Sequence, residues 1–124
     1  MKNVLVVDDE PDILEALVLM WTYEQPGFRI RTALSGKLAL EAIAAEAPDL
    51  VLSDHKMPGM DGVELLRRVR ELLPKVPMIL MTAHLDSDVA RRAKEESGAN
   101  LCIAKPFNIP YVESIIQAML GKVT

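Results

Sequence analysis

The sequence predicts a three-layer α/β fold, in which helices cover both faces of a five-stranded parallel sheet. Short apolar segments alternate with helical patterns along all 124 residues, which is typical of consecutive βαβ units. This length corresponds to one domain, to which we assign residues 1–124. The predicted strands cover residues 3–8, 28–33, 49–54, 77–82 and 100–105.

Four of these strands are almost continuously apolar, as expected when both faces of a sheet are covered by helices. The second strand, Phe28-Arg29-Ile30-Arg31-Thr32, alternates between apolar and polar residues instead. We therefore place it at an edge of the sheet.

The helices have recognisable starts. Pro11 suits a first helical turn, Ser35 can cap the second helix, and Asp61 with Glu64 resembles a capping box for the third. Gly121 is expected to end the last helix. Apolar residues at helical spacing follow each start, and those expected to be buried include Ile13, Leu17, Trp21, Leu38, Ile43, Leu65, Leu72, Val112 and Ile116.

The composition excludes several classes of protein. A net charge of -4 argues against direct binding to nucleic acid, which normally requires a basic face. The longest uninterrupted apolar run, Ala16 to Trp21, is too short to span a bilayer, and the N-terminus has no signal-peptide cleavage region. Cys102 is the single cysteine and cannot form an internal disulfide. These features indicate a cytoplasmic protein that does not bind a membrane.

Charged and hydroxyl side chains stand where four predicted strands end. Asp8 and Asp9 follow the first strand, Asp54 ends the third, Thr82 the fourth and Lys105 the fifth. In open α/β sheets, sites form outside the carboxyl ends of the strands, near the point where strand order reverses. We therefore expect all five side chains to converge on one pocket.

Three carboxylates in one pocket repel one another unless a cation lies among them. Mg²⁺ prefers oxygen ligands and needs only one or two carboxylates, because it keeps several waters. We predict Asp9 and Asp54 as direct ligands, together with the backbone carbonyl of Lys56. Asp8 acts through water or by orienting the other ligands.

The same residues predict phosphoryl chemistry. A carboxylate such as Asp54, placed before a loop rich in turn formers, can attack phosphorus in line and form an aspartyl phosphate. Lys105 would neutralise charge on the phosphoryl group. Thr82 would hydrogen-bond a phosphoryl oxygen only after the transfer, which makes it a sensor of the modified state.

Four motifs stand in order along the chain: Val7-Asp8-Asp9-Glu10-Pro11, Asp54-His55-Lys56-Met57-Pro58-Gly59-Met60-Asp61-Gly62, Met81-Thr82-Ala83 and Ala104-Lys105-Pro106-Phe107. Together they are highly specific. With these motifs, the chain resembles a receiver domain of two-component response regulators along nearly its whole length. That family has a doubly wound, flavodoxin-like sheet of order 2-1-3-4-5.

The resemblance implies a role for each site residue. Asp54 is the phosphoacceptor, Asp8 and Asp9 form the acidic pair, Thr82 is the switch hydroxyl and Lys105 is the family's lysine. The peptide bond after Lys105 is usually cis in the family.

The resemblance also implies partners. The phosphodonor would be a histidine kinase or a histidine phosphotransfer protein. The domain would catalyse only its own phosphorylation and dephosphorylation, so it is not an enzyme in the turnover sense. Its output would be an effector domain beyond Thr124 or a separate protein, and phosphorylation can promote a homodimer.

Two other functions stay open at this point. Cys102 stands where many family members carry an aromatic residue that moves with the threonine. The first alternative is therefore a pseudo-receiver that acts only as a protein-binding scaffold. The second alternative is a Mg²⁺-dependent aspartyl phosphatase. Such enzymes need two acidic residues separated by one residue after the first strand, whereas Asp8 and Asp9 are adjacent. His55 and His84 are expected to be exposed loop residues beside the pocket.

Overall fold

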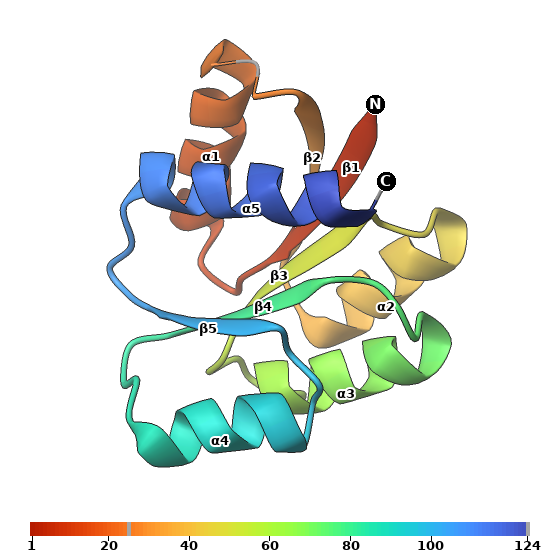
Figure 1. The fold of residues 1–124 in the computed structure, drawn as a ribbon, viewed down its shortest axis with the longest axis vertical. Helices are drawn as coiled ribbons and strands as arrows, with labels where there is room; N and C mark the ends of the chain where they lie inside the picture. Colours follow the sequence, from red (N-terminus) through yellow and green to blue (C-terminus); the bar gives the residue numbers. More distant parts are fainter. Residues whose placement is uncertain (25, 124) are drawn as a thin grey trace.

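The computed structural model describes residues 1–24 and 26–123, which form five strands alternating with five helices (Figure 1). The alternation agrees with the βαβ units predicted from the sequence. The elements are β1 (Lys2–Val7), α1 (Pro11–Glu24), β2 (Phe28–Ala33), α2 (Gly36–Ala45), β3 (Leu50–Asp54), α3 (Gly62–Leu72), β4 (Met78–Thr82), α4 (Ser87–Glu95), β5 (Leu101–Ala104) and α5 (Ile109–Val123).

The strands form one parallel sheet in the order β2-β1-β3-β4-β5, which confirms the predicted fold. Helices α1 and α5 lie on one face, and α2, α3 and α4 lie on the other (Figure 1). Strand β2 is at an edge, as its alternating sequence predicted. Strand order reverses between β1 and β3, so the carboxyl ends of these two strands flank the expected binding position.

Each face of the sheet has its own apolar core. Alternate side chains of β1, β3 and β4 pack under α2, α3 and α4, and the remaining ones pack under α1 and α5. Aromatic residues contribute little, apart from the edge-to-face pair of Trp21 and Phe28, whose ring centroids are 5.1 Å apart. Aliphatic and Met side chains therefore fill most of both cores, as the 4% aromatic content predicts.

Two of the predicted helix caps are confirmed. Ser35 Oγ accepts a hydrogen bond from the Leu38 amide at 3.1 Å, and Asp61 Oδ1 accepts one from the Glu64 amide at 2.9 Å. Each bond satisfies an amide that has no partner within the helix. The caps fix where α2 and α3 begin, and α3 begins directly after the loop that follows Asp54.

Three predictions about the helices were wrong. Leu38 and Leu72 are 47% and 60% exposed, because each lies at the margin of its apolar stripe, beyond the reach of the sheet. Helix α5 continues through Gly121 to Val123. Gly121 does not adopt a positive φ, so it does not form the left-handed cap that ends many helices.

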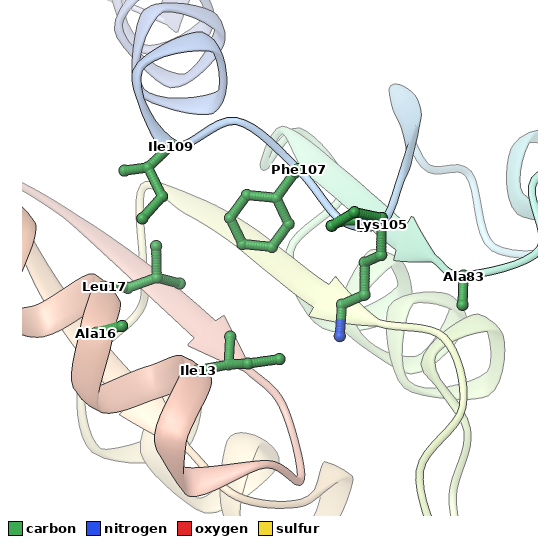
Figure 2. A pocket seen from close by; sticks show the side chains of 8 residues that line it. Ile13, Ala16, Leu17, Ala83, Lys105, Phe107 and Ile109 are labelled. Carbon is green, nitrogen blue, oxygen red and sulfur yellow. The ribbon is translucent and has the colours of Figure 1, made fainter.

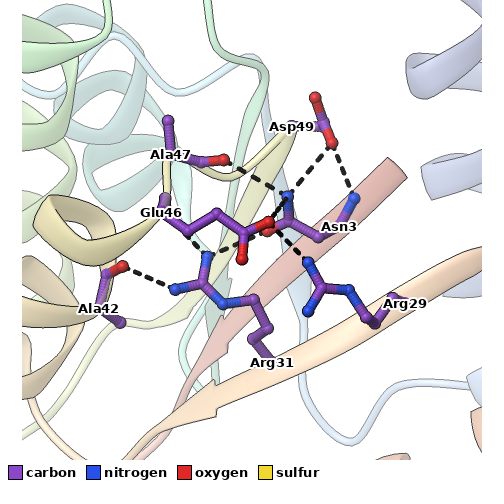
Figure 3. A network of polar contacts seen from close by, with 7 residues as sticks. All are labelled: Asn3, Arg29, Arg31, Ala42, Glu46, Ala47 and Asp49. Atoms are coloured by element: carbon purple, nitrogen blue, oxygen red, sulfur yellow. Dashed lines mark hydrogen bonds and ion pairs between the residues drawn. The ribbon is translucent and has the colours of Figure 1, made fainter. Parts of the chain in front are cut away.

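A polar network joins the amino ends of β1 and β2 to the end of α2 (Figure 3). Arg31 donates to the carbonyls of Ala42 at 2.6 Å and Glu46 at 2.8 Å, at the end of the helix. The Ala42 carbonyl also accepts from the Glu46 amide at 3.0 Å. The Asn3 amide donates to Asp49 Oδ2 at 2.7 Å. These contacts hold the amino ends of β1 and β2 in place, on the side of the sheet opposite to the carboxyl ends of the strands.

Among residues 1–24 and 26–123, no helix has the length and apolar character needed to cross a bilayer.

Candidate functional site

The parallel register brings the strand-end residues together. Val7 pairs with Ser53 across β1 and β3, so Asp8 and Asp54 are the next residues on neighbouring strands. Thr82 pairs with Ala104 across β4 and β5, so Lys105 follows directly beside it. The predicted residues therefore end their strands at one edge of the sheet.

The ammonium group of Lys105 joins two carboxylates. Its Nζ atom lies 2.8 Å from Asp8 Oδ2 and 3.1 Å from Asp54 Oδ1. Asp8 is fully buried and Asp54 is 6% exposed. Charge-assisted contacts of this length in a partly dry pocket are strong, and they hold both carboxylates in place.

Burial and charge shift the pKa values of this group in defined directions. Burial raises the pKa of Asp54; the Lys105 hydrogen bond opposes this rise and the Asp8 charge adds to it, so the net shift is upward. Burial lowers the pKa of Lys105, but its bonds to Asp8 and Asp54 outweigh burial and raise it overall. The lysine is therefore charged at neutral pH, and the two carboxylates compete for it.

The structure also places three carboxylates in a cluster at the start of α1. One oxygen from each of Asp8, Asp9 and Glu10 lies within 4.8 Å of the others. The Glu10 amide donates to Asp8 Oδ1 at 3.0 Å, which bends the chain back toward the site. One of the three, Asp8, also shares Lys105 with Asp54. Carboxylate oxygens grouped in this way are the donor chemistry that suits Mg²⁺. Glu10 was not among the predicted ligands, although its place in the acidic run was a visible signal.

Thr82 contacts a histidine for which the sequence predicts an exposed position. His55 is only 2% exposed, and its Nδ1 lies 3.1 Å from Thr82 Oγ1. That expectation was wrong because the main chain continues the β3–β4 pairing by one residue, with the His55 amide donating to Met81 O at 2.8 Å. Burial lowers the pKa of the His55 ring. His84 is exposed as expected, and its amide donates to Thr82 Oγ1 at 3.2 Å.

The other site features agree with the expectations or refine them. The peptide bond between Lys105 and Pro106 is cis. Cys102 is half-buried against the core under α2, α3 and α4, and burial raises the pKa of its thiol. A raised pKa disfavours the reactive thiolate, so Cys102 acts as a packing residue. Lys56 is exposed in the loop after β3, two residues beyond Asp54.

An apolar pocket of ≈ 400 Å³ opens next to Lys105 (Figure 2). Ile13 and Leu17 of α1 line one side, and Phe107 and Ile109 line the other. The pocket thus gives apolar contact area beside the acidic site, between α1 and the segment that joins β5 to α5.

We expect Asp54→Asn to stabilise the metal-free domain at pH 7 by about 0.5–2 kcal/mol, because it removes one of two buried carboxylates that share a single lysine. The folded-state pKa of Asp54 is raised above 3.8, so the fold favours the protonated carboxyl. The stability that Asp54 contributes is therefore fully present below pH 3.8 and is lost as the pH rises through the folded-state pKa. The advantage of the variant should therefore shrink as the pH falls toward 4. Urea denaturation in the presence of a chelator, at pH 7 and pH 4, measures it; an advantage that grows on acidification would contradict the assignment.

Comparison with known proteins gives consistent matches. The profile of the response regulator receiver domain matches residues 4–117. The chain is 35% identical over 119 residues to sporulation initiation phosphotransferase F of Bacillus subtilis, covering 96% of this chain and 94% of that protein. It is 38% identical over 122 residues to the DNA-binding transcriptional regulator NtrC of Escherichia coli, covering 95% of this chain but only 24% of NtrC. A CheY-like receiver domain protein from Methanospirillum hungatei superposes with a TM-score of 0.89 at 29% identity, over 98% of this chain and 95% of the other.

Proposed function

Because the chain belongs to the response regulator receiver domain family, we propose that Asp54 accepts a phosphoryl group and that this modification controls an output partner. The observation that carries the proposal is the contact of Lys105 with both Asp8 and Asp54 at the carboxyl end of the sheet. It supplies a fixed carboxylate oxygen, a cation beside it and a buried acidic partner. These are the groups that phosphoryl transfer to a carboxylate requires.

The transfer follows from this arrangement. An oxygen of the Asp54 carboxylate attacks phosphorus; the new P–O bond forms as the bond to the donor nitrogen breaks, and the leaving nitrogen keeps the electron pair. Lys105 Nζ lies 3.1 Å from Asp54 Oδ1, so it can pair with a phosphoryl oxygen bound there. Thr82 then donates its hydroxyl proton to another phosphoryl oxygen and reports the modification.

Asp9, Asp54 and the backbone carbonyl of Lys56 would hold Mg²⁺, with Asp8 bound through water or orienting them. When bound, the ion would neutralise charge on the phosphoryl oxygens. The position of Asp8 supports this role: it is fully buried and shares Lys105 with Asp54, so both carboxylates are held in place before any phosphoryl group arrives.

The partners belong to the same proposal. A histidine kinase or phosphotransfer protein would donate the phosphoryl group and use the apolar pocket beside Lys105 as contact area. The domain would act in the cytoplasm as a signalling module that catalyses only its own modification. NtrC is much longer than the matched segment, which supports control of an effector domain. The match to sporulation initiation phosphotransferase F spans 94% of that protein, which supports control of a separate output protein instead. A phosphorylation-dependent homodimer would use the α4–β5–α5 face.

Intact-mass analysis after incubation with Mg²⁺ and a small acyl-phosphate or phosphoramidate donor tests the proposal. We expect one added phosphoryl group on the parent, none without Mg²⁺, and none on Asp54→Asn. Asp88→Asn, which changes an exposed carboxylate of α4, is the matched control and should be modified like the parent.

An adduct that persists in Asp54→Asn would place the acceptor elsewhere. Absence of an adduct on the parent calls for titration with beryllofluoride and Mg²⁺, because rapid hydrolysis removes an aspartyl phosphate. Failure to bind beryllofluoride as well would favour the pseudo-receiver scaffold.

A further inference from the structure

His55 has a main chain that is fixed on both sides. Its amide donates to Met81 O at 2.8 Å and to Asp54 Oδ1 at 2.9 Å, and its carbonyl accepts from the Gly62 amide at 2.8 Å. The residue thus joins β3, β4 and the start of α3. Its ring is buried as well, so the contact of the ring with Thr82 is shielded from water.

The ring of His55 and the hydroxyl of Thr82 share one side of the sheet. Leu80 packs in the core under α2, α3 and α4, so Thr82, two residues later, faces the same way. Leu52 packs in the core under α1 and α5, so Asp54 faces that opposite side. The charges that act on the His55 ring are those of Lys56 in the loop after β3, Asp61, which caps α3, and Arg92 of α4.

The contact with His55 therefore directs the Thr82 hydroxyl toward α3 and α4. Thr82 Oγ1 lies 3.1 Å from His55 Nδ1 and accepts from the His84 amide at 3.2 Å. A hydroxyl has one proton and two lone pairs, so these contacts use most of its bonding capacity. To bond a phosphoryl oxygen on Asp54, Thr82 has to rotate and leave the His55 ring nitrogen.

We propose that His55 is a positioning residue that holds Thr82 in the unmodified arrangement and so weakens the response to phosphorylation. The inference rests on the proposed phosphorylation of Asp54. A buried hydrogen bond between neutral groups changes an equilibrium by about tenfold, so losing it should favour the switched state by about that factor.

Beryllofluoride with Mg²⁺ serves as the probe, because it imitates an aspartyl phosphate, and calorimetry measures its affinity. His55→Leu, which lacks a ring nitrogen, should bind the probe about tenfold more tightly than the parent. His55→Asn keeps a polar amide near the position of Nδ1 and should retain the parent's affinity. In a Thr82→Val background, which has no hydroxyl, His55→Leu should bring no gain.

Each contrary result has one interpretation. If the parent binds beryllofluoride and His55→Leu binds it equally well, the inference about His55 fails while the proposed function stands. If His55→Leu raises the beryllofluoride affinity equally in the Thr82→Val background, the site is loosened generally, and the inference about His55 also fails. If the parent does not bind at all, the proposed function fails and the inference fails with it.

A measurement on the parent alone covers the case in which His55→Leu does not fold. The ¹⁵N chemical shift of His55 Nδ1 reports its hydrogen bond, so it should change when beryllofluoride binds and Thr82 leaves. A shift unchanged at saturation would overturn the inference without any variant.

Discussion

Gly62→Ala is expected to lower the free energy of unfolding by about 3 kcal/mol or more and to slow phosphorylation of Asp54. A Cβ atom at position 62 would lie 2.1 Å from the carbonyl oxygen of Asp54 and 2.8 Å from a methyl group of Leu80. The first of these is a main-chain atom at the end of a central strand, so it cannot move aside cheaply. The Gly62 amide also donates to His55 O at 2.8 Å, which prevents α3 from shifting outward.

Chemical denaturation measures the effect on stability, and intact mass over time measures phosphorylation. Gly121→Ala is the matched control, because the added Cβ meets no described atom within 4 Å and the residue lies inside α5. The control should keep the parent's stability or gain up to about 1 kcal/mol from helix propensity. If Gly62→Ala unfolds at the same denaturant concentration as the parent, the close approach of α3 to Asp54 does not constrain the site.

Lys105→Met is expected to destabilise the metal-free domain by about 3 kcal/mol at pH 7, because two buried carboxylates lose the cation they share. The deficit should shrink when Asp8→Asn is added, since one uncompensated charge is then removed. It should also shrink as the pH falls. Without the lysine bond that lowers it, the folded-state pKa of Asp54 lies still further above 3.8, so protonation stabilises the fold.

Lys94→Met is the matched control for this variant, because Lys94 is an exposed lysine of α4 far from the strand ends in the fold. Its stability should stay within about 0.5 kcal/mol of the parent's. Urea denaturation of both variants, with chelator and then with Mg²⁺, completes the test. An equal loss in the two variants would show that the contacts of Lys105 with Asp8 and Asp54 do not account for the loss of stability.

Most of the architecture follows from the sequence by itself. Apolar runs mark four strands, including β5 at the other edge, and alternation marks β2 as an edge. Ser35 and Asp61 mark helix starts. These signals can be recognised because they depend on local periodicity and main-chain bonding. That Lys105 and Asp8, 97 positions apart in the chain, end their strands at the same edge of the sheet also follows from the sequence. Parallel strands bring their carboxyl ends to one edge, so residues at those ends meet whatever their separation in sequence.

Other features were decided only when the elements packed. Local periodicity identifies the apolar side of a helix, but the neighbouring elements determine how far burial extends, so Leu38 and Leu72 remain exposed. The burial of His55 depends on the main-chain bond to Met81, and its contact with Thr82 joins residues 27 positions apart. The sequence by itself determined which residues end the strands; only the tertiary structure decided which side of the sheet each side chain faces there, because that depends on where pairing stops.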